Sequence, residues 1–265
     1  MTADAPTILA ASAGFVPDRR GGVRPGPIHR FAADLAGANP ARAGANPARH
    51  GANPARPGAA QTRICLLAQA TGDPAGLIAT CYAAFAGTEF AMSHLQLFPM
   101  PNVADVRAHL LGQDVIWVEG GSVANLCAVW RAHGLDEILY EAWRAGVVLA
   151  GISAGSICWH RGGCTDSYGP ELRGFTDGLG WLPYSNGVHY DNESQRRPTM
   201  HRLIGDGTLP DGYATDDGAA LLYRDTRLVE AVAGRPGPRA YELRRAADGT
   251  VIETALPTRV LGYEA

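Results

Sequence analysis

The regular alternation of apolar, β-rich runs with helical patterns is the feature that most constrains the fold of this chain. Five short runs rich in β-forming residues predict strands, and each ends at turn-forming or polar residues. They are Thr7 to Ala11, Arg63 to Ala68, His94 to Phe98, Asp114 to Val118 and Val147 to Gly151. Strands that alternate with helices form a parallel sheet covered on both faces, and its ligands bind at the carboxyl ends of the strands. We therefore expect an α/β fold with functional loops after Val118 and Gly151.

Helical patterns fill the intervals between these strands. Pro27 to Ala36 has a proline in its first turn, and the segment from Asp73-Pro74 to Phe85 opens in a similar way. Asn102 and Ser122 are residue types that cap helix N-termini. The sequence thus predicts four helices among the five strands.

The chain beyond about residue 160 is richer in glycine and less regular. It contains one helical stretch and several short strands, the last two of which are expected to form an antiparallel ribbon. These segments are Arg197 to Ile204, Ala219 to Tyr223, Leu228 to Val232, Arg239 to Arg245 and Val251 to Thr254. We interpret them as the completion of the same unit, so that residues 1–265 form a single α/β domain.

A tandem repeat interrupts the pattern. The sequence GANPAR occurs three times, starting at Gly37, Gly44 and Gly51, with a period of seven residues. Each unit carries a proline and a glycine and has no large apolar residue, which excludes a coiled-coil heptad. We expect a flexible, solvated insertion at residues 37–58 that takes no part in chemistry.

The basic residues exclude several classes of enzyme. All 23 of them are arginine, and the chain contains no lysine. A phosphate-binding loop with its lysine, a Schiff-base enzyme and a Ser-Lys dyad all need an amine that this chain lacks. The net charge of −3 gives no reason to expect nucleic acid or a membrane as a partner. Acyl transfer by Ser, Cys or Thr remains open.

Cysteine usage and the terminus bear on the compartment. The five cysteines are odd in number and form no CxxC pair, so reduced, mostly buried thiols are expected. The apolar run Ile8 to Ala11 is too short for a signal peptide, and no stretch reaches transmembrane length. We therefore expect a cytoplasmic protein. No HExxH or similar ligand spacing is present, so neither a metal nor an organic cofactor is expected.

The segment Gly151-Ile152-Ser153-Ala154-Gly155 matches the G-x-S-x-G nucleophile elbow. It follows an apolar strand and precedes a helical pattern, as the elbow requires. The serine of such an elbow has a strained backbone, and residues two positions away must be small. The motif is only moderately specific in a chain with 33 glycines, where an ordinary strand-to-helix turn is the alternative. Ser153 is the candidate nucleophile.

A second glycine-rich turn supports this interpretation. Glu119-Gly120-Gly121-Ser122 directly follows another predicted strand, so both turns would meet at one edge of a parallel sheet. The amides of Gly121 and Ala154 could then form an oxyanion hole for acyl transfer. The purely structural alternative, a tight turn with Ser122 as a helix cap, is compatible with that role.

A nucleophilic serine needs a base and an acid. His189 lies in a loop-like segment from which a side chain can reach across the sheet edge. His160 is expected two turns along the elbow helix, and His201 lies in an arginine-rich helical stretch, so both are weaker candidates. Asp216 and Asp217 precede a predicted strand and offer a carboxylate to orient the imidazole, although Asp-Gly is also a common turn pair.

These residues resemble peptidase E, the aspartyl dipeptidase family of serine peptidases. The resemblance extends from Thr7 to about Tyr223 and rests on Gly120-Gly121, the elbow around Ser153, and His189. It implies a parallel sheet flanked by helices, similar to class I glutamine amidotransferases and flavodoxin-like proteins, with short antiparallel strands near the C-terminus. It also implies hydrolysis of short peptides, including dipeptides with an N-terminal aspartate.

Site residues follow from the resemblance one by one. Ser153 matches the family nucleophile and His189 its base. Asp217-Gly218 matches a family Glu-Gly turn with a shorter carboxylate, and Asp216 is its immediate rival. Asp166 fits an acidic residue that follows the nucleophile in the family and ranks second after Asp217. No arginine matches the family's aspartate pocket, and the nearest candidates in sequence are Arg173, Arg196 and Arg197.

Two other functions remain open at this stage. One is another acyl hydrolase on the same scaffold, such as an esterase or a cyanophycinase-like peptidase. The other is a catalytically silent binding protein that keeps the fold and the pocket. For the serine peptidase itself, the expected partner is a small peptide substrate, and the sequence leaves a homo-oligomer open.

Overall fold

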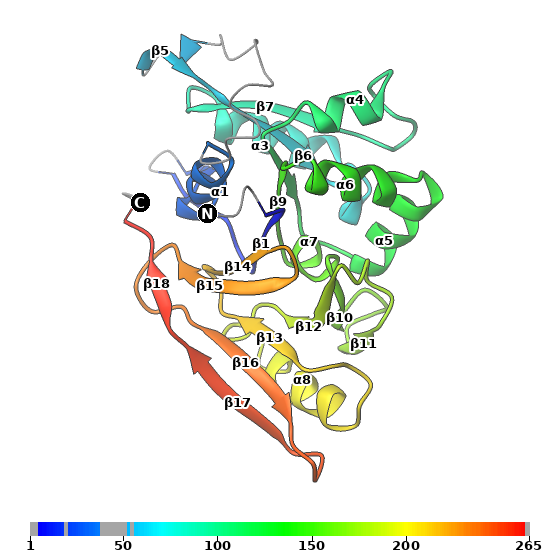
Figure 1. The fold of residues 1–265 in the computed structure, drawn as a ribbon. Coiled ribbons are helices and arrows are strands. Elements are labelled where there is room, and N and C mark those ends of the chain that lie inside the picture. Colours follow the sequence, from blue (N-terminus) through cyan, green and yellow to red (C-terminus); the bar gives the residue numbers. More distant parts are fainter. Residues whose placement is uncertain (1–4, 19–20, 38–51, 54–55, 263–265) are drawn as a thin grey trace.

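Two β-sheets organise the chain in the computed structural model, which describes residues 5–18, 21–37, 52–53 and 56–262 (Figure 1). Within these residues, one sheet has eight strands in the order β18-β15-β14-β1-β9-β8-β6-β7. The other has six strands in the order β11-β10-β12-β13-β16-β17. The eight-stranded sheet is built from β1 (Thr7–Ala11), β6 (Thr62–Leu67), β7 (Phe90–Leu95), β8 (Val115–Val118), β9 (Val148–Ile152), β14 (Ala219–Arg224), β15 (Arg227–Ala233) and β18 (Thr258–Val260).

The six-stranded sheet is built from β10 (His160–Thr165), β11 (Arg173–Phe175), β12 (Leu182–Gly187), β13 (Gly212–Thr215), β16 (Ala240–Arg245) and β17 (Val251–Leu256). The helices are α1 (Pro27–Gly37), α3 (Ala75–Phe85), α4 (Val106–Leu111), α5 (Val123–Ala132), α6 (Leu135–Arg144), α7 (Ala154–Ile157) and α8 (Arg196–Gly205), with a 3-10 turn at Gln69–Thr71. Two short antiparallel strand pairs, β2 (Phe15–Pro17) with β3 (Val23–Pro25) and β4 (Ala52–Asn53) with β5 (Arg56–Ala60), complete the secondary structure of the described residues.

The centre of the larger sheet is parallel, as the sequence predicts. β1, β9, β8, β6 and β7 pair in parallel along this order, while β14 and β15 extend the sheet in antiparallel fashion from β1. Because parallel strands end at the same edge, the loops after β1, β6, β8 and β9 lie together. That edge receives both glycine-rich turns identified in the sequence.

Helices cover both faces of this sheet (Figure 1). Along β8, Ile116 and Val118 belong to one hydrophobic core together with residues of α5 and α6. Val115 and Trp117 point the other way and pack with residues of α1 and α3. Successive side chains of a strand point to opposite faces, so a strand buried on both sides reads as one continuous apolar run. This explains why the strand sequences show no polar alternation.

Three local expectations are wrong in detail. The predicted strand His94 to Phe98 lies earlier, at Phe90–Leu95. Asn102 does not cap a helix; its Oδ1 accepts the Gln96 amide, and Asp105 is the N-cap of α4. The elbow helix α7 ends after one turn, so that His160 begins strand β10 instead of continuing the helix.

The second sheet is a feature that the sequence analysis did not predict. We expected loops and a few short strands after residue 160, but this region pairs into a mixed sheet that packs against α8. Its strands contain glycines where side chains would collide with a neighbouring backbone. A Cβ on Gly162 would lie 1.9 Å from the Phe175 carbonyl oxygen, for example. Such glycine-rich strands carry too few apolar residues to be recognised by periodicity.

The predicted insertion at residues 37–58 lies mostly outside the described residues. Its last part forms the antiparallel β4–β5 pair, which leads into β6. In the part of the chain that the structure describes, no helix is long and apolar enough to cross a membrane.

Candidate active site

Ser153 occupies a sharp turn between β9 and α7 and has the strained backbone expected of a nucleophile elbow. Its φ and ψ are 55° and −115°, a conformation that non-glycine residues rarely adopt. The flanking glycines allow the turn to close. A Cβ on Gly151 would lie 2.4 Å from the Gly155 carbonyl oxygen, and one on Gly155 would lie 2.3 Å from that of Val118. Larger residues at either position would open the elbow.

The Gly120-Gly121 turn lies directly against Ser153. A Cβ on Gly120 would be 3.1 Å from the Ser153 Cβ and 3.5 Å from its Oγ. Gly121 has a φ of 135°, and a Cβ there would collide with the Ala70 carbonyl oxygen at 2.6 Å. Ala154 is the first residue of α7, so its N–H has no acceptor within the helix. The two predicted oxyanion residues therefore lie on turns that meet at Ser153.

Glu119 precedes this turn and is a buried carboxyl that the sequence analysis did not single out. It accepts hydrogen bonds from Trp117 Nε1 at 2.9 Å and from the Gly120 amide. Burial outweighs both bonds and raises the pKa of Glu119 to about 7. Because the Gly120 N–H is bound to this carboxyl, the neighbouring Gly121 N–H is the better donor for an oxyanion. The sequence feature that could have indicated this buried carboxyl is a glutamate directly before a Gly-Gly turn.

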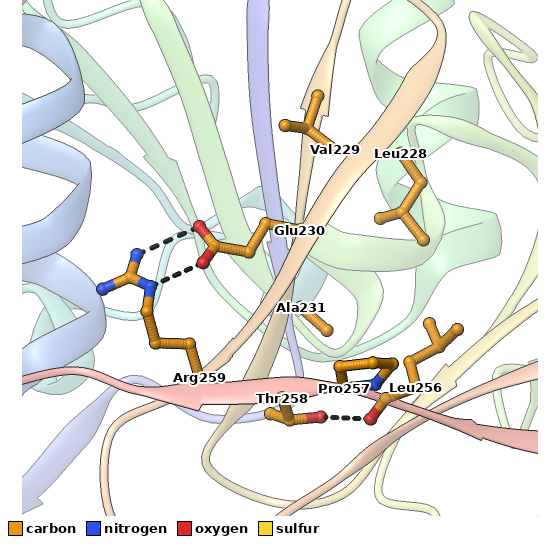
Figure 2. Close-up of a pocket in the computed structure, with 8 residues that line it drawn as sticks. All are labelled: Leu228, Val229, Glu230, Ala231, Leu256, Pro257, Thr258 and Arg259. Atoms are coloured by element: carbon orange, nitrogen blue, oxygen red, sulfur yellow. Dashed lines mark hydrogen bonds and ion pairs between the residues drawn. The ribbon is translucent and has the colours of Figure 1, made fainter.

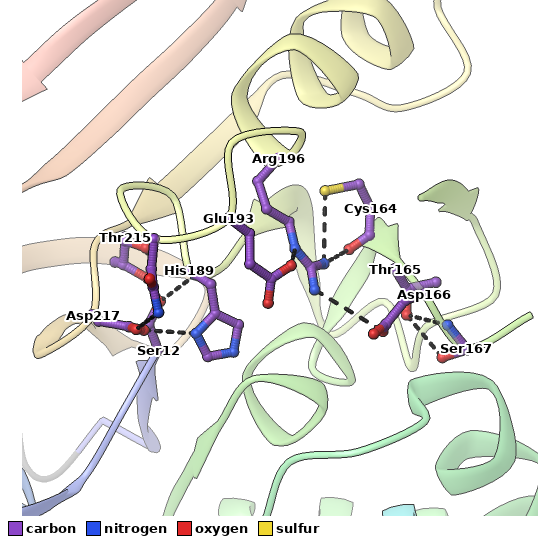
Figure 3. Close-up of polar contacts among 11 residues, drawn as sticks. Ser12, Cys164, Thr165, Asp166, Ser167, His189, Glu193, Arg196, Thr215 and Asp217 are labelled. Carbon is purple, nitrogen blue, oxygen red and sulfur yellow. Dashed lines mark hydrogen bonds and ion pairs between the residues drawn. The ribbon is translucent and has the colours of Figure 1, made fainter. Parts of the chain in front are cut away.

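His189 lies after β12 and is paired with Asp217. Its Nδ1 is 2.6 Å from Asp217 Oδ1 (Figure 3). Asn192 Nδ2 donates to the other carboxylate oxygen of Asp217 at 3.1 Å. The hydrogen bond to His189 lowers the pKa of Asp217. His189 has a φ of 53°, so it too is held in a strained conformation. A carboxylate in contact with Nδ1 fixes the imidazole tautomer that leaves Nε2 free to accept a proton.

Strand β1 connects the two groups. The Ser153 amide donates to the Ala11 carbonyl at 3.1 Å, and the His189 amide donates to the hydroxyl of the next residue, Ser12, at 3.0 Å. Among the described residues, no hydrogen bond joins Ser153 Oγ to His189. Catalytic hydrogen bonds of this kind are often long in unliganded enzymes and shorten when substrate binds.

The two rival carboxylates have other partners. Asp216 accepts from the Arg239 amide at 2.9 Å and from the Tyr241 hydroxyl at 3.4 Å. Asp166 is mostly exposed and lies 4.0 Å from the guanidinium of the buried Arg196. Of the three candidate acids, the structure brings only Asp217 into contact with His189.

Arg196 is the centre of a second polar group close to His189 (Figure 3). Its guanidinium binds Glu193 at 2.6 Å and the Cys164 carbonyl at 2.6 Å, and the Glu193 amide donates to the His189 carbonyl. Arg197 pairs with Glu253 and lies over the rings of Tyr190 and Tyr241. Both arginines are thus committed to partners, whereas Arg173 lies exposed on β11.

The other two histidines have structural surroundings. His160 is fully buried between the Ser156 carbonyl and the Tyr223 hydroxyl, and burial lowers its pKa to about 4. His201 Nε2 lies 2.9 Å from Glu253 Oε2, in the second sheet. Neither contacts Ser153 or Asp217 among the described residues.

A surface pocket elsewhere lacks the groups that acyl transfer needs. It has a volume of about 460 Å³ and lies between β15 and the segment from Leu256 to Arg259 (Figure 2). Its charged side chains, Glu230 and Arg259, form an ion pair with each other at 2.5 Å. Across the described part of the chain, no group of three or more His, Cys, Asp or Glu side chains is arranged to hold a metal ion.

Several known proteins are similar to this chain in sequence or in fold. The sequence model of peptidase family S51 matches residues 55–231. The uncharacterized peptidase YgaJ of Bacillus subtilis (strain 168) is 45% identical over 202 residues, which cover 76% of this chain and 86% of the relative.

Two solved structures share the fold. One is a peptidase from an acI-B1 actinobacterium, with a TM-score of 0.65, 15% identity, and coverage of 96% of this chain and 95% of the other. The second, from Listeria monocytogenes EGD-e, is described as a candidate peptidase E protein; its TM-score is 0.53 at 16% identity, with coverage of 85% and 97%. The large parallel-dominated sheet flanked by helices is common to this group. On the family match and the 45% identical relative, the chain is a serine peptidase that belongs to peptidase family S51.

Proposed function

We propose that this peptidase hydrolyses short peptides through a Ser153-His189-Asp217 triad and an acyl-enzyme, with dipeptides that begin with aspartate as candidate substrates. The observation that carries the proposal is the 2.6 Å separation of His189 Nδ1 and Asp217 Oδ1, on a loop tied to the strand that neighbours the Ser153 elbow. A carboxylate, an imidazole and a strained serine at one sheet edge are the groups that acyl transfer requires.

The proposed reaction has two halves. Ser153 Oγ attacks the peptide carbonyl while His189 Nε2 takes its proton, and Asp217 stabilises the imidazolium that forms. The negative charge on the carbonyl oxygen is stabilised by the Gly121 and Ala154 amides, each typically worth about 100- to 1000-fold in rate. His189 then protonates the leaving amine, and water hydrolyses the acyl-enzyme by the reverse proton transfers.

The preference for an N-terminal aspartate rests on the resemblance to peptidase E. An aspartate side chain would need a cation, and both Arg196 and Arg197 already neutralise carboxylates. A substrate panel therefore decides this part of the proposal independently of the triad.

The first test compares four proteins on aspartyl p-nitroanilide and a panel of Asp-X and other X-X dipeptides. These are the wild type, Ser153→Ala, His189→Ala and the matched control His201→Ala, which removes a histidine bound to a carboxylate outside the site. We expect both site variants to lose about 10⁴-fold or more in kcat, because triad residues act as a unit. His201→Ala should keep wild-type kcat.

Three outcomes would change the proposal. If the wild type cleaves dipeptides that begin with other residues but none that begins with aspartate, the triad stands and the aspartyl preference is wrong. If Ser153→Ala turns over substrate at the wild-type rate, the nucleophile is wrong. If neither turnover nor labelling by a fluorophosphonate probe occurs, the chain is better explained as a binding protein.

A further inference from the structure

Ser12 is a buried polar residue at the carboxyl end of β1 that the proposed chemistry does not use. Its side chain is 1% exposed and lies between the two sheets. The hydroxyl can donate to the Thr215 carbonyl at 2.8 Å and accept from the His189 amide at 3.0 Å, and it lies 2.7 Å from Thr215 Oγ1 (Figure 3). A serine hydroxyl has one proton and two lone pairs, so these three contacts use its full capacity.

The hydroxyl partners of Ser12 and its neighbour in the chain connect it to every segment of the proposed triad. Ala11, the preceding residue, accepts the Ser153 amide at 3.1 Å. Thr215 is two residues from Asp217, and its carbonyl also accepts the Tyr190 amide at 3.1 Å. His189 itself has a φ of 53°, a conformation that needs surrounding contacts to hold it. Ser12 therefore lies where the nucleophile, base and acid segments meet.

We propose that Ser12 is a positioning residue, whose hydroxyl holds the His189 backbone, in the segment after β12, in place relative to the Ser153 elbow. The inference rests on the proposed triad. Ser12 touches no reacting atom, and it acts only through the placement of the imidazole. A displacement of about 1 Å in a catalytic group can cost about 100-fold in rate.

Ser12→Ala removes the hydroxyl, and Ser185→Ala is the matched control. Ser185 is equally buried and donates to the Pro210 carbonyl at 2.7 Å, but it has no contact with His189 among the described residues. We expect Ser12→Ala to lower kcat and the rate of fluorophosphonate labelling together by about 10- to 100-fold, with KM nearly unchanged. Ser185→Ala should show a similar loss of thermal stability with wild-type kcat.

Both rates are normalised to the folded fraction measured by circular dichroism, so that lost stability is not counted as lost activity. If Ser12→Ala does not fold, Ser12→Cys provides the same test, because a thiol fills the space and hydrogen-bonds only weakly. Wild-type kcat and labelling in the Ser12 variant, alongside an inactive Ser153→Ala, would overturn this inference alone. Equal activity in Ser153→Ala and the wild type would overturn the triad and this inference with it.

Discussion

The two halves of the candidate site are built in different ways. Ser153 and the Gly120-Gly121 turn belong to the parallel sheet, and close steric contacts within two adjacent strand ends determine their geometry. His189 and Asp217 lie in the segments that follow β12 and β13 of the second sheet, and contacts between residues distant in sequence hold them, including His189 to Asp217 and His189 to Ser12. The first half can be recognised from a short motif, whereas the second depends on how two sheets pack.

Because of this contrast, we expect the two halves of the candidate site to respond differently to mutation. On the nucleophile side, an added methyl group meets backbone atoms that cannot move away. On the side of His189 and Asp217, each side chain is held by one or two hydrogen bonds. The loss of a single polar group there should lower activity more than it disturbs the packing of the protein. Four predictions test the contrast, in order of decreasing expected effect.

The largest effect is expected on the base side, where the acid was ambiguous in the sequence. Asp217→Asn keeps the size of the side chain but removes the charge that fixes the imidazole tautomer, and we expect kcat to fall about 10⁴-fold. Asp166→Asn is the matched control and should change kcat by less than about threefold, a shift of under 1 kcal/mol in the barrier. Steady-state kinetics on aspartyl p-nitroanilide measures both. If kcat fell further in Asp166→Asn than in Asp217→Asn, Asp166 would be the catalytic acid in place of Asp217.

On the side of Ser153, Gly121→Ala should displace the Gly120-Gly121 turn that we propose as part of the oxyanion hole. Its Cβ would meet the Ala70 carbonyl oxygen at 2.6 Å, so the Gly121 amide must move. We expect kcat to fall about 100- to 1000-fold. Gly134→Ala is the control, because its φ of 64° is also positive but no atom lies within 4 Å of the added Cβ. Equal kcat losses in both variants would argue against an oxyanion role.

Glu119, which precedes the same turn, makes the free energy of unfolding depend on pH. Its pKa is raised to about 7 in the folded protein, above the ordinary value of 4.5, so the folded state binds the extra proton between these limits. The stabilisation from this group is present below pH 4.5 and is lost as pH rises toward 7. Relative to the wild type, Glu119→Gln should therefore gain stability over this window, by up to about 3 kcal/mol. Urea unfolding at several pH values measures the difference, and parallel curves for the two proteins would contradict it.

The smallest effect concerns the helix caps. Ser122 Oγ accepts the Asn125 amide at 3.1 Å next to the oxyanion turn, and Asp105 Oδ1 accepts the Ala108 amide at 2.8 Å at the N-terminus of α4. Replacing either with alanine should cost about 1 kcal/mol of stability. Only Ser122→Ala should also lower kcat, because it adjoins Gly121. If kcat fell equally in Asp105→Ala, the effect would not be specific to the turn.

The sequence analysis was most successful where local rules apply. Strands β1, β8 and β9 were recognised because they are buried on both faces and are therefore continuously apolar. Ser122 was correctly identified as the cap of α5. The shift of β7 and the cap at Asp105 show the limit of this approach. Several polar residues near a boundary satisfy the same local rule, and tertiary contacts choose among them.

The candidate site shows the same division between features set by local rules and features set by tertiary contacts. The elbow at Ser153 and the Gly120-Gly121 turn follow from the sequence itself, because sharp turns and close backbone crossings restrict which residues can occupy them. The resemblance ranks Asp217 first among the candidate acids, but only the tertiary structure shows that Asp217, and neither Asp166 nor Asp216, contacts His189. The position of Ser12 between the two sheets likewise follows only from the tertiary structure. Hydrogen bonds between residues far apart in the chain depend on how the sheets pack, and no local pattern of residues encodes that packing.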